Sequence, residues 1–351
     1  MSFRPQGAPP AKNIVFPPQT EGDVPRFIYL GELLGDANFA SGSGRSLTAG
    51  EVLGWLAGII RGEEAPRFLS RPQGIVVDGT GRILVTDFGR GSIMVFDEKG
   101  GALDEWINAD KVLRFLAPVA IARGPDDQFF VTDADLAFVA RLDKSGKPIA
   151  TIGKGQFARP TGIAYEAATK RLFVADTHAH HIKVFDLDGR LLDVWGERGE
   201  EADRPKNKPR DEDELMLNLP THLALANGRL YISDTMNARV QVISAATGKP
   251  LRVIGTRGTF VGNLVRPKGV AVDSEENVYV IEGYHDHLLV FNRQGRFLMP
   301  IGGEGATPGK FNLPAGLWID GRDRVYVADT HNGRVQIFQF LGGGVESGTG
   351  D

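Results

Sequence analysis

The sequence predicts an all-β fold, a six-bladed β-propeller of four-stranded antiparallel blades, and two observations carry that prediction. A proline, a short apolar strand, a turn and a second strand ending in an acid recur six times along the 351 residues. The repeating unit of about 45 residues holds several short strands without helical periodicity, which is typical of a propeller blade. The opening prolines are Pro72, Pro118, Pro160, Pro220, Pro267 and Pro314, and the closing acids are Asp87, Asp133, Asp176, Asp234, Glu282 and Asp329. Since the repeat uses nearly the whole chain, we predict one large domain.

The last unit shows the order of the strands. Strand a runs through residues 313–320, strand b through 324–329 and strand c through 334–338, and each is rich in β-branched and aromatic residues. Earlier units add a fourth strand, d, after a tight hairpin such as 292–295, in which a glycine supplies positive φ. We therefore expect the blades to begin at residues 71, 117, 159, 219, 266 and 313.

The sixth unit lacks strand d. After Phe340 the chain runs into glycine-rich residues 341–351, which we predict to be a flexible tail. The missing strand pattern occurs near the N-terminus instead, in residues 26–35. Pairing of this segment with strand c of the sixth blade would close the ring and remove an exposed sheet edge. The propeller is therefore predicted to span residues 26–340, with 26–35 as its closing strand.

Two segments flank the closing strand. Residues 1–25 are rich in proline and predict an extended or disordered lead. Residues 36–70 form an insertion before the first blade, and we expect a short helix in it. The reason is that Thr48 to Glu51 make a capping box and are followed by apolar residues at helical spacing.

Composition limits the classes of function. A formal net charge of −4 and a pI near 6.0 give no electrostatic reason to expect binding to nucleic acid or to an anionic membrane. The absence of cysteine excludes disulfides, thiolate zinc sites and thiol nucleophiles. No stretch is long enough to span a membrane, and the lead is not a signal peptide as written. An export signal that had been removed would place the protein in the periplasm or outside the cell, and otherwise it would be cytoplasmic. A monomer is expected.

The repeated phrase resembles that of the NHL-repeat family. The resemblance is carried by Pro-Lys-Gly-Val-Ala-Val-Asp at residues 267–273 and by Asp-Thr-His-Asn-Gly-Arg at 329–334. It covers about 71–340 plus the closing strand and recurs six times in register. The resemblance implies a six-bladed β-propeller. It implies no single activity, because the family includes an amidating lyase, RNA-binding modules and many binding scaffolds.

Strand direction divides the loops between two faces. The d–a connections and b–c loops share one face, called here the loop face, and the a–b turns and c–d hairpins share the other, the turn face. The two enlarged d–a connections, 35–70 and 196–216, belong to the loop face. All seven histidines map to it as well: His178, His180, His181, His222, His285, His287 and His331. They either contact a ligand or form hydrogen bonds to the loop backbone.

The repeat also supplies an internal control. The acid that closes strand b is present in every blade and is therefore expected to be structural, accepting hydrogen bonds from loop N–H groups. Departures from the repeat are more informative. The glycine two residues after the opening proline becomes His222 in the fourth blade, where it should lie at the channel mouth. A small residue of strand a becomes Trp318 in the sixth blade, and it must fill the channel or wedge between blades.

Two enzymatic functions, a zinc-dependent lyase and a lactonase, would require particular residues near the start of strand a. In the amidating lyase that the resemblance implies, zinc-binding histidines directly follow the opening proline, but this chain has Gln73, Val119, Thr161, Thr221, Lys268 and Ala315 there. His222 lies one residue later, which points it to the opposite side of a strand. A lactonase needs channel carboxylates for a divalent cation, and the strand openings contain none. The acids Asp78, Asp273 and Asp320 lie at the far end of strand a.

We therefore predict a non-catalytic binding or scaffold propeller that presents its loop face to a protein, peptide or small-molecule ligand, without a metal or cofactor. The alternative is a propeller enzyme, a lyase or a lactonase-like hydrolase, with an atypical histidine-rich site at the channel mouth. Nucleic acid is disfavoured because the basic loop residues are interspersed with acids. The candidate binding residues are His222, His178, His180, His181, Tyr284, His285, His287, His331, Lys268 and Trp318.

Overall fold

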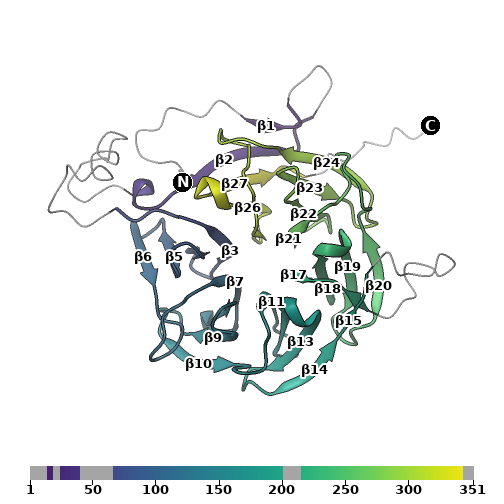
Figure 1. The fold of residues 1–351 in the computed structure, drawn as a ribbon. Helices are drawn as coiled ribbons and strands as arrows, with labels where there is room; N and C mark the ends of the chain where they lie inside the picture. The colour runs from purple at the N-terminus through teal and green to yellow at the C-terminus, as the bar shows by residue number, and fades with distance from the viewer. Residues whose placement is uncertain (1–13, 19–23, 40–65, 201–214, 343–351) are drawn as a thin grey trace.

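Six antiparallel sheets surround a central axis in a closed ring (Figure 1). The computed structural model describes residues 14–18, 24–39, 66–200 and 215–342. The first three blades are β3 (Pro72–Val77), β4 (Ile83–Asp87), β5 (Ser92–Asp97) and β6 (Ala102–Trp106); β7 (Pro118–Arg123), β8 (Phe129–Asp133), β9 (Phe138–Leu142) and β10 (Pro148–Ile152); and β11 (Pro160–Glu166), β12 (Arg171–Asp176), β13 (His181–Asp186) and β14 (Leu191–Trp195). The fourth and fifth blades are β17 (Pro220–Ala226), β18 (Arg229–Asp234), β19 (Arg239–Ser244) and β20 (Pro250–Ile254); and β21 (Pro267–Val272), β22 (Val278–Glu282), β23 (His287–Phe291) and β24 (Phe297–Gly302).

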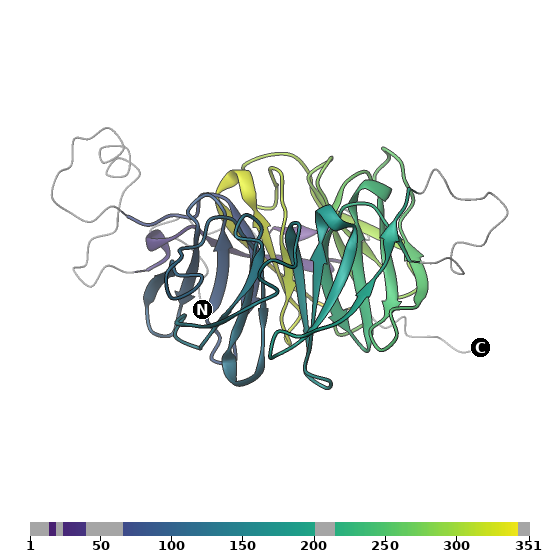
Figure 2. The same cartoon turned by 60° about the horizontal axis from the view of Figure 1, so that its bottom comes forward.

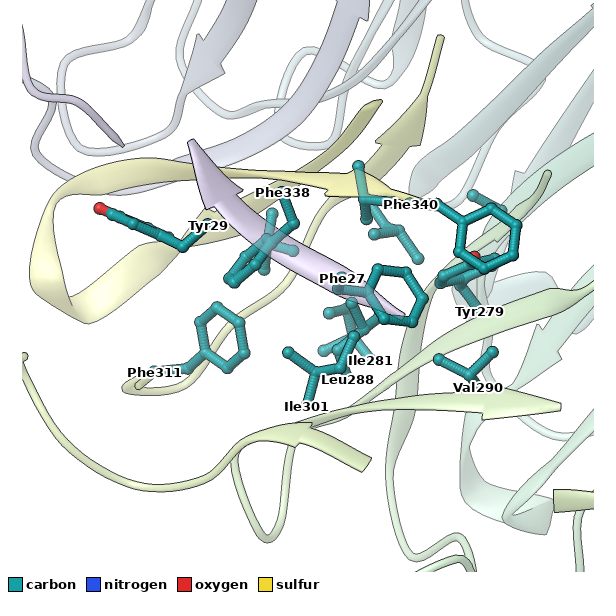
Figure 3. Packing of buried hydrophobic residues seen from close by; sticks show 14 residues of the cluster. Phe27, Tyr29, Tyr279, Ile281, Leu288, Val290, Ile301, Phe311, Phe338 and Phe340 are labelled. Atoms are coloured by element: carbon teal, nitrogen blue, oxygen red, sulfur yellow. The ribbon is translucent and has the colours of Figure 1, made fainter. Parts of the chain in front are cut away.

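The sixth blade is assembled from both ends of the chain. It contains β25 (Leu317–Ile319), β26 (Arg324–Asp329) and β27 (Arg334–Phe340), and β2 (Phe27–Leu33) pairs with β27 as its fourth strand. The register places Phe27 opposite Phe340 and Leu33 opposite Val335. This pairing confirms the predicted ring closure. It leaves no unpaired edge on β27 and seals the apolar cluster between the fifth and sixth blades, where Phe27 lies against Phe340 and Tyr279 (Figure 3).

Part of the predicted lead also belongs to the packed ring. β1 (Val15–Phe16) pairs with β2 and adds a fifth strand to the sixth blade. Ile14 and Phe16 pack against the same apolar cluster, and the phenyl group of Phe16 meets that of Phe338 edge to face at 5.8 Å. The composition of residues 1–25 concealed this contact because the two apolar residues are surrounded by prolines.

Three predicted features lie outside the described residues: the short helix within 40–65, the tail from 343 to 351, and residues 201–214 of the charged connection. The described ends of that connection are β15 (Glu197–Arg198) and β16 (Met216–Leu217), which pair in parallel. No helix among the described residues is long and apolar enough to cross a membrane.

The seams between blades explain the glycine that follows the opening proline by two residues. A Cβ atom added at Gly74 or Gly162 would come within 2.7 Å of a carbonyl oxygen in strand a of the next blade. At Gly316 the same atom would lie only 1.5 Å from the carbonyl oxygen of Gln73. Strand a of each blade is therefore packed backbone to backbone against its neighbour, which is why a side chain at this position is exceptional.

The b–c loops lie together on one face of the ring. Three of them form short 3-10 turns, η3 (Thr177–Ala179), η5 (Thr235–Asn237) and η6 (Thr330–Asn332), which are visible along the same edge of the ring in Figure 2. A threonine at the start of each turn donates to the carbonyl of the opening proline of the next blade, as Thr177 does to Pro220 at 2.7 Å. This face is the loop face predicted from strand direction.

Candidate functional site

In the fourth and sixth blades the acid that closes strand b is held by three side chains of its own b–c loop and strand c. Asp329 accepts hydrogen bonds from Asn332 Nδ2 at 2.8 Å, Arg334 Nε at 2.7 Å and Gln336 Nε2 at 3.0 Å. The fourth blade repeats the arrangement with Asp234, Asn237, Arg239 and Gln241. We call this set the acid clamp. The acid also accepts from backbone N–H groups, so its predicted structural role agrees with these contacts.

The full clamp is confined to the fourth and sixth blades, and the b–c loop of the fifth blade lacks it, as do those of the first three. Histidines replace the asparagine and arginine, at His285 and His287, and Leu289 replaces the glutamine. Glu282 is almost fully buried and accepts from the backbone N–H groups of Arg266, Tyr284 and His285 at 2.7, 3.1 and 3.0 Å. The loop is therefore held mainly through its backbone, with one side-chain contact to the acid from Nδ1 of His285 at 3.2 Å.

The side chains of this loop form an aromatic group on the loop face. The Tyr284 side chain is 58% exposed and its ring meets the imidazole of His285 edge to face at 4.7 Å. The imidazole of His287 lies 6.3 Å from that of His285. Burial lowers the pKa of His287, and the neighbouring His285 adds to the effect. We call Tyr284, His285 and His287 the fifth-blade aromatic group.

A second departure from the repeat lies beside this group. In the third and fourth blades the residue after the opening proline and the residue after the acid are both threonines, and their hydroxyl oxygens are 2.7 Å apart. In the fifth blade the pair is Lys268 and Gly283. A Cβ atom added at Gly283 would lie 3.4 and 3.5 Å from Cε and Cδ of Lys268. The lysine stem therefore lies in van der Waals contact with the position where a threonine side chain would begin.

Lys268 is partly buried and has no counter-ion in contact among the described residues. Its Nζ makes no hydrogen bond or ion pair with any residue that the structure describes. Burial lowers the pKa of Lys268, and the nearby carboxylate of Asp286 offsets part of that effect. Asp286 itself accepts from the backbone N–H of Leu313 at 2.8 Å.

His222 lies on the neighbouring strand β17 and lines an axial cavity of about 50 Å³. The cavity is otherwise walled by Trp318 and by glycines and aliphatic residues from the strand a regions of all six blades. Nδ1 of His222 is 3.0 Å from Oγ1 of Thr221, whereas the Thr221 hydroxyl turns towards the b–c loop. Loss of hydration lowers the pKa of His222 to about 3, and Lys268 contributes to this shift, so the imidazole is neutral near pH 7.

Trp318 occupies the channel itself. It lines both the cavity beside His222 and a second axial cavity of about 170 Å³ towards the turn face. Its side chain packs against the apolar clusters on either side of the first blade, and the buried Nε1 has no hydrogen-bond partner among the described residues. The predicted roles of channel filling and wedging between blades are thus combined in one side chain.

The remaining candidate histidines do not converge on this site. Nδ1 of His180 accepts from the backbone N–H of Leu219 at 3.2 Å, which is the backbone role expected from the repeat. His181 opens β13 opposite Asp176, and His178 and His331 are exposed in the b–c loops of other blades. Within the described ranges no three His, Asp or Glu residues are grouped so that they could hold a metal ion.

Gly283, Asp286 and the exposed apolar residues of the loop face were not among the binding residues predicted from the sequence. Met236 is 44% exposed in the fourth b–c loop, and Leu313 is 39% exposed just before the sixth opening proline. None of the exposed large apolar side chains in the described segments lies in an a–b turn or a c–d hairpin. The replacement of threonine by Gly283 was visible in the aligned repeats and could have revealed the space that Lys268 uses.

Comparison with known proteins agrees with this architecture. A family model described as NHL repeat matches residues 69–96, 157–185 and 311–338. The chain contains NHL repeats. The protein brain tumor of Drosophila melanogaster is 28% identical over 147 residues, which are 41% of this chain and 12% of that relative. This NHL-repeat chain therefore matches only a small part of the length of the curated relative.

Solved structures show the same fold at low sequence identity. A gluconolactonase from Xanthomonas campestris has a TM-score of 0.57 at 13% identity, over 78% of this chain and 86% of its own. A streptogramin B lyase has a TM-score of 0.56 at 13% identity, over 78% and 94%. At such identities the likeness shows the propeller alone and carries no activity to this protein.

Proposed function

We propose that this protein is a binding propeller that takes a protein or peptide segment on its loop face, over the fourth and fifth blades. The observation that carries the proposal is the fifth-blade aromatic group, which stands where the fourth and sixth blades have the acid clamp. Gly283, directly before this group, lies against the side chain of Lys268, whose Nζ has no partner among the described residues.

The chemistry of the surface supports a macromolecular ligand. Tyrosine offers a large contact area at a low entropic cost, and exposed aromatic side chains are frequent energetic centres of protein interfaces. Tyr284 is flanked on the same face by the partly exposed Met236 and Leu313. The packed ring beneath holds these loops in place, which reduces the ordering cost of binding.

A catalytic role has weaker support. The axial cavity beside His222 measures about 50 Å³, whereas small-molecule pockets are usually several hundred Å³ in volume. The resemblance to a lyase and to a gluconolactonase rests on the fold. The loop face therefore fits recognition of an extended segment better than enclosure of a small substrate.

The test is selection of peptides from a random display library on the immobilised full chain, followed by titration of the enriched peptides in solution. We expect binding that Tyr284→Ala weakens by about tenfold, which is the effect of removing a central aromatic contact. Leu298→Ala is the matched control, since Leu298 is exposed on the outer strand of the same blade. The proposal fails if no peptide is enriched, or if binding survives Tyr284→Ala and is lost on substitution of turn-face residues.

A further inference from the structure

The paired substitution of Lys268 and Gly283 places a positive charge where the third and fourth blades have two hydroxyl groups. The glycine leaves open the space next to the lysine stem, which a threonine side chain would crowd beyond its Cβ. Lys268 is partly buried, and its Nζ is not among the fully buried polar atoms that lack a partner, so it remains open to solvent. Because part of its hydration is lost, an anionic or strongly accepting partner would interact with it more strongly than with a fully exposed lysine.

The hydrogen bonds around His222 determine what its imidazole offers. Thr235 donates its only hydroxyl proton to the carbonyl of Pro267 at 2.8 Å. The Thr221 hydroxyl must then be the donor in its 2.7 Å contact with Thr235 Oγ1. Oγ1 of Thr221 consequently accepts from Nδ1–H of His222 at 3.0 Å. In the neutral imidazole this leaves Nε2 unprotonated, so it is a hydrogen-bond acceptor.

His222 on β17 and Lys268 on the neighbouring strand β21 are thus a neutral acceptor and a cationic donor. We propose that Lys268 and His222 form a subsite for one carboxylate-bearing residue of a bound peptide, with the carboxylate on Nζ of Lys268 and the adjacent N–H on Nε2 of His222. This inference rests on the proposed function, whose ligand it specifies. An aspartate within the peptide and a C-terminal residue both carry a carboxylate close to an N–H group.

The charge balance favours a carboxylate over a phosphate. One lysine supplies one positive charge, and Asp286 already neutralises part of its field. Glu282 lies buried at the start of the same loop. A phosphate group carries nearly two negative charges and is usually held by several cations or by an arginine fork, and this subsite has neither. A singly charged group is the anion that matches it.

The experiment measures anisotropy of fluorescent peptide pools on the full chain. Four pools of equal length carry a central Asp, a central Asn, a central phosphoserine, or a free C-terminal carboxylate in place of the amide. We expect the central-Asp pool or the free-acid pool to bind about tenfold more tightly than the Asn pool, which is typical of one charge-assisted hydrogen bond. The pool that shows the preference identifies the source of the carboxylate.

Variants separate the subsite from the rest of the surface. Lys268→Met should reduce the preference to less than about twofold, since it keeps the stem and removes the charge. Gly283→Thr should do the same while keeping the charge, because it restores the third- and fourth-blade residue and displaces the stem. The matched control is Lys144→Met, which removes an exposed lysine from a turn-face hairpin. Thermal unfolding checks that each variant is folded. If Gly283→Thr does not fold, the result for Lys268→Met alone decides whether the subsite exists.

Failure of the subsite is distinguishable from failure of the proposed function. Equal binding of the Asp, Asn and free-acid pools, with dependence on Tyr284, would overturn the carboxylate subsite and leave the binding propeller standing. A preference that survives Lys268→Met, or one for phosphoserine over both carboxylates, would also overturn it. Absence of binding by every pool would overturn both.

Discussion

The b–c loops of the fifth and sixth blades occupy equivalent positions and are stabilised differently. In the sixth blade Asp329 is held by the side chains of Asn332 and Arg334, and the guanidinium also reaches Glu32 of the closing strand at 2.9 Å. In the fifth blade Glu282 is held mainly by backbone N–H groups, together with Nδ1 of His285 at 3.2 Å. The buried acid is thus common to all six b–c loops, whereas the side chains around it differ from blade to blade.

Ring closure gives the clamp of the sixth blade a second role. The sixth blade joins the two ends of the chain, and Arg334 of its clamp also pairs with Glu32 of the closing strand. The fourth blade has the same clamp although its strands are continuous in sequence, so ring closure alone does not explain where the clamp occurs. In the fifth blade no side chain of the b–c loop fixes a closing strand, so substitutions there are expected to cost less stability.

The largest effect is expected from removing the closing strand. A chain lacking residues 1–35 loses β1 and β2 and exposes the edge of β27, so it should aggregate or show no cooperative unfolding by circular dichroism. A chain lacking residues 1–20 should fall between this variant and the full chain, since Ile14 and Phe16 pack on the core. Removal of 343–351 is the control and should leave the melting temperature unchanged. A 36–351 chain that melts like the full chain would contradict the closure.

Arg334→Ala and His287→Ala compare the two loops directly, because both residues open strand c. Arg334 has a nearly buried side chain paired with Asp329 and Glu32, and its loss should cost about 3–5 kcal/mol of unfolding free energy. His287→Ala should cost less than about 1 kcal/mol and instead weaken binding to the loop face. Urea denaturation gives both values. Equal losses would mean that the fifth loop is as structural as the sixth.

The fold could be predicted because the strand pattern of one blade repeats along the sequence. Six occurrences of the same strand order specify the blades, and a missing strand at one end matches an unassigned one at the other. The contact of Phe16 with Phe338 could not be predicted, since it joins two segments far apart in the chain and no repeat describes it. In the sixth blade strand a was predicted at residues 313–320, whereas β25 covers only Leu317–Ile319.

The candidate site was predictable only in part. His222 was visible as a departure from glycine, and Tyr284 and His287 as unusual loop residues. Their separation from His178 and His331 depends on the angle between blades, which sequence spacing does not specify. The contact between Lys268 and Gly283 needed three-dimensional proximity, because the two residues lie on different strands of one sheet and neither is unusual alone.

The pH dependence of stability tests whether His222 is desolvated in the channel. Burial lowers its folded-state pKa to about 3, below the ordinary value of about 6.5, so the unfolded chain binds the additional proton between these values. This group therefore contributes its full stability above pH 6.5 and loses it as the pH falls towards 3. His222→Gly should reduce the slope of unfolding free energy between pH 6 and 4 by up to about 1.4 kcal/mol per pH unit. An unchanged slope would mean that the imidazole is hydrated.

The smallest and most discriminating effect is expected at Lys268. Burial lowers the pKa of this lysine, so the folded state disfavours the charged form, and Nζ has no partner among the described residues. Lys268→Met keeps the apolar stem against Gly283 and should raise the unfolding free energy by a few tenths to about 1 kcal/mol. Lys144→Met, on the exposed turn face, should change it by less than about 0.5 kcal/mol. The sign decides the matter. A gain in stability accompanied by a loss of carboxylate preference marks a residue kept for binding, whereas a loss of more than about 1 kcal/mol would place Lys268 with Arg334 among the residues that hold the ring together.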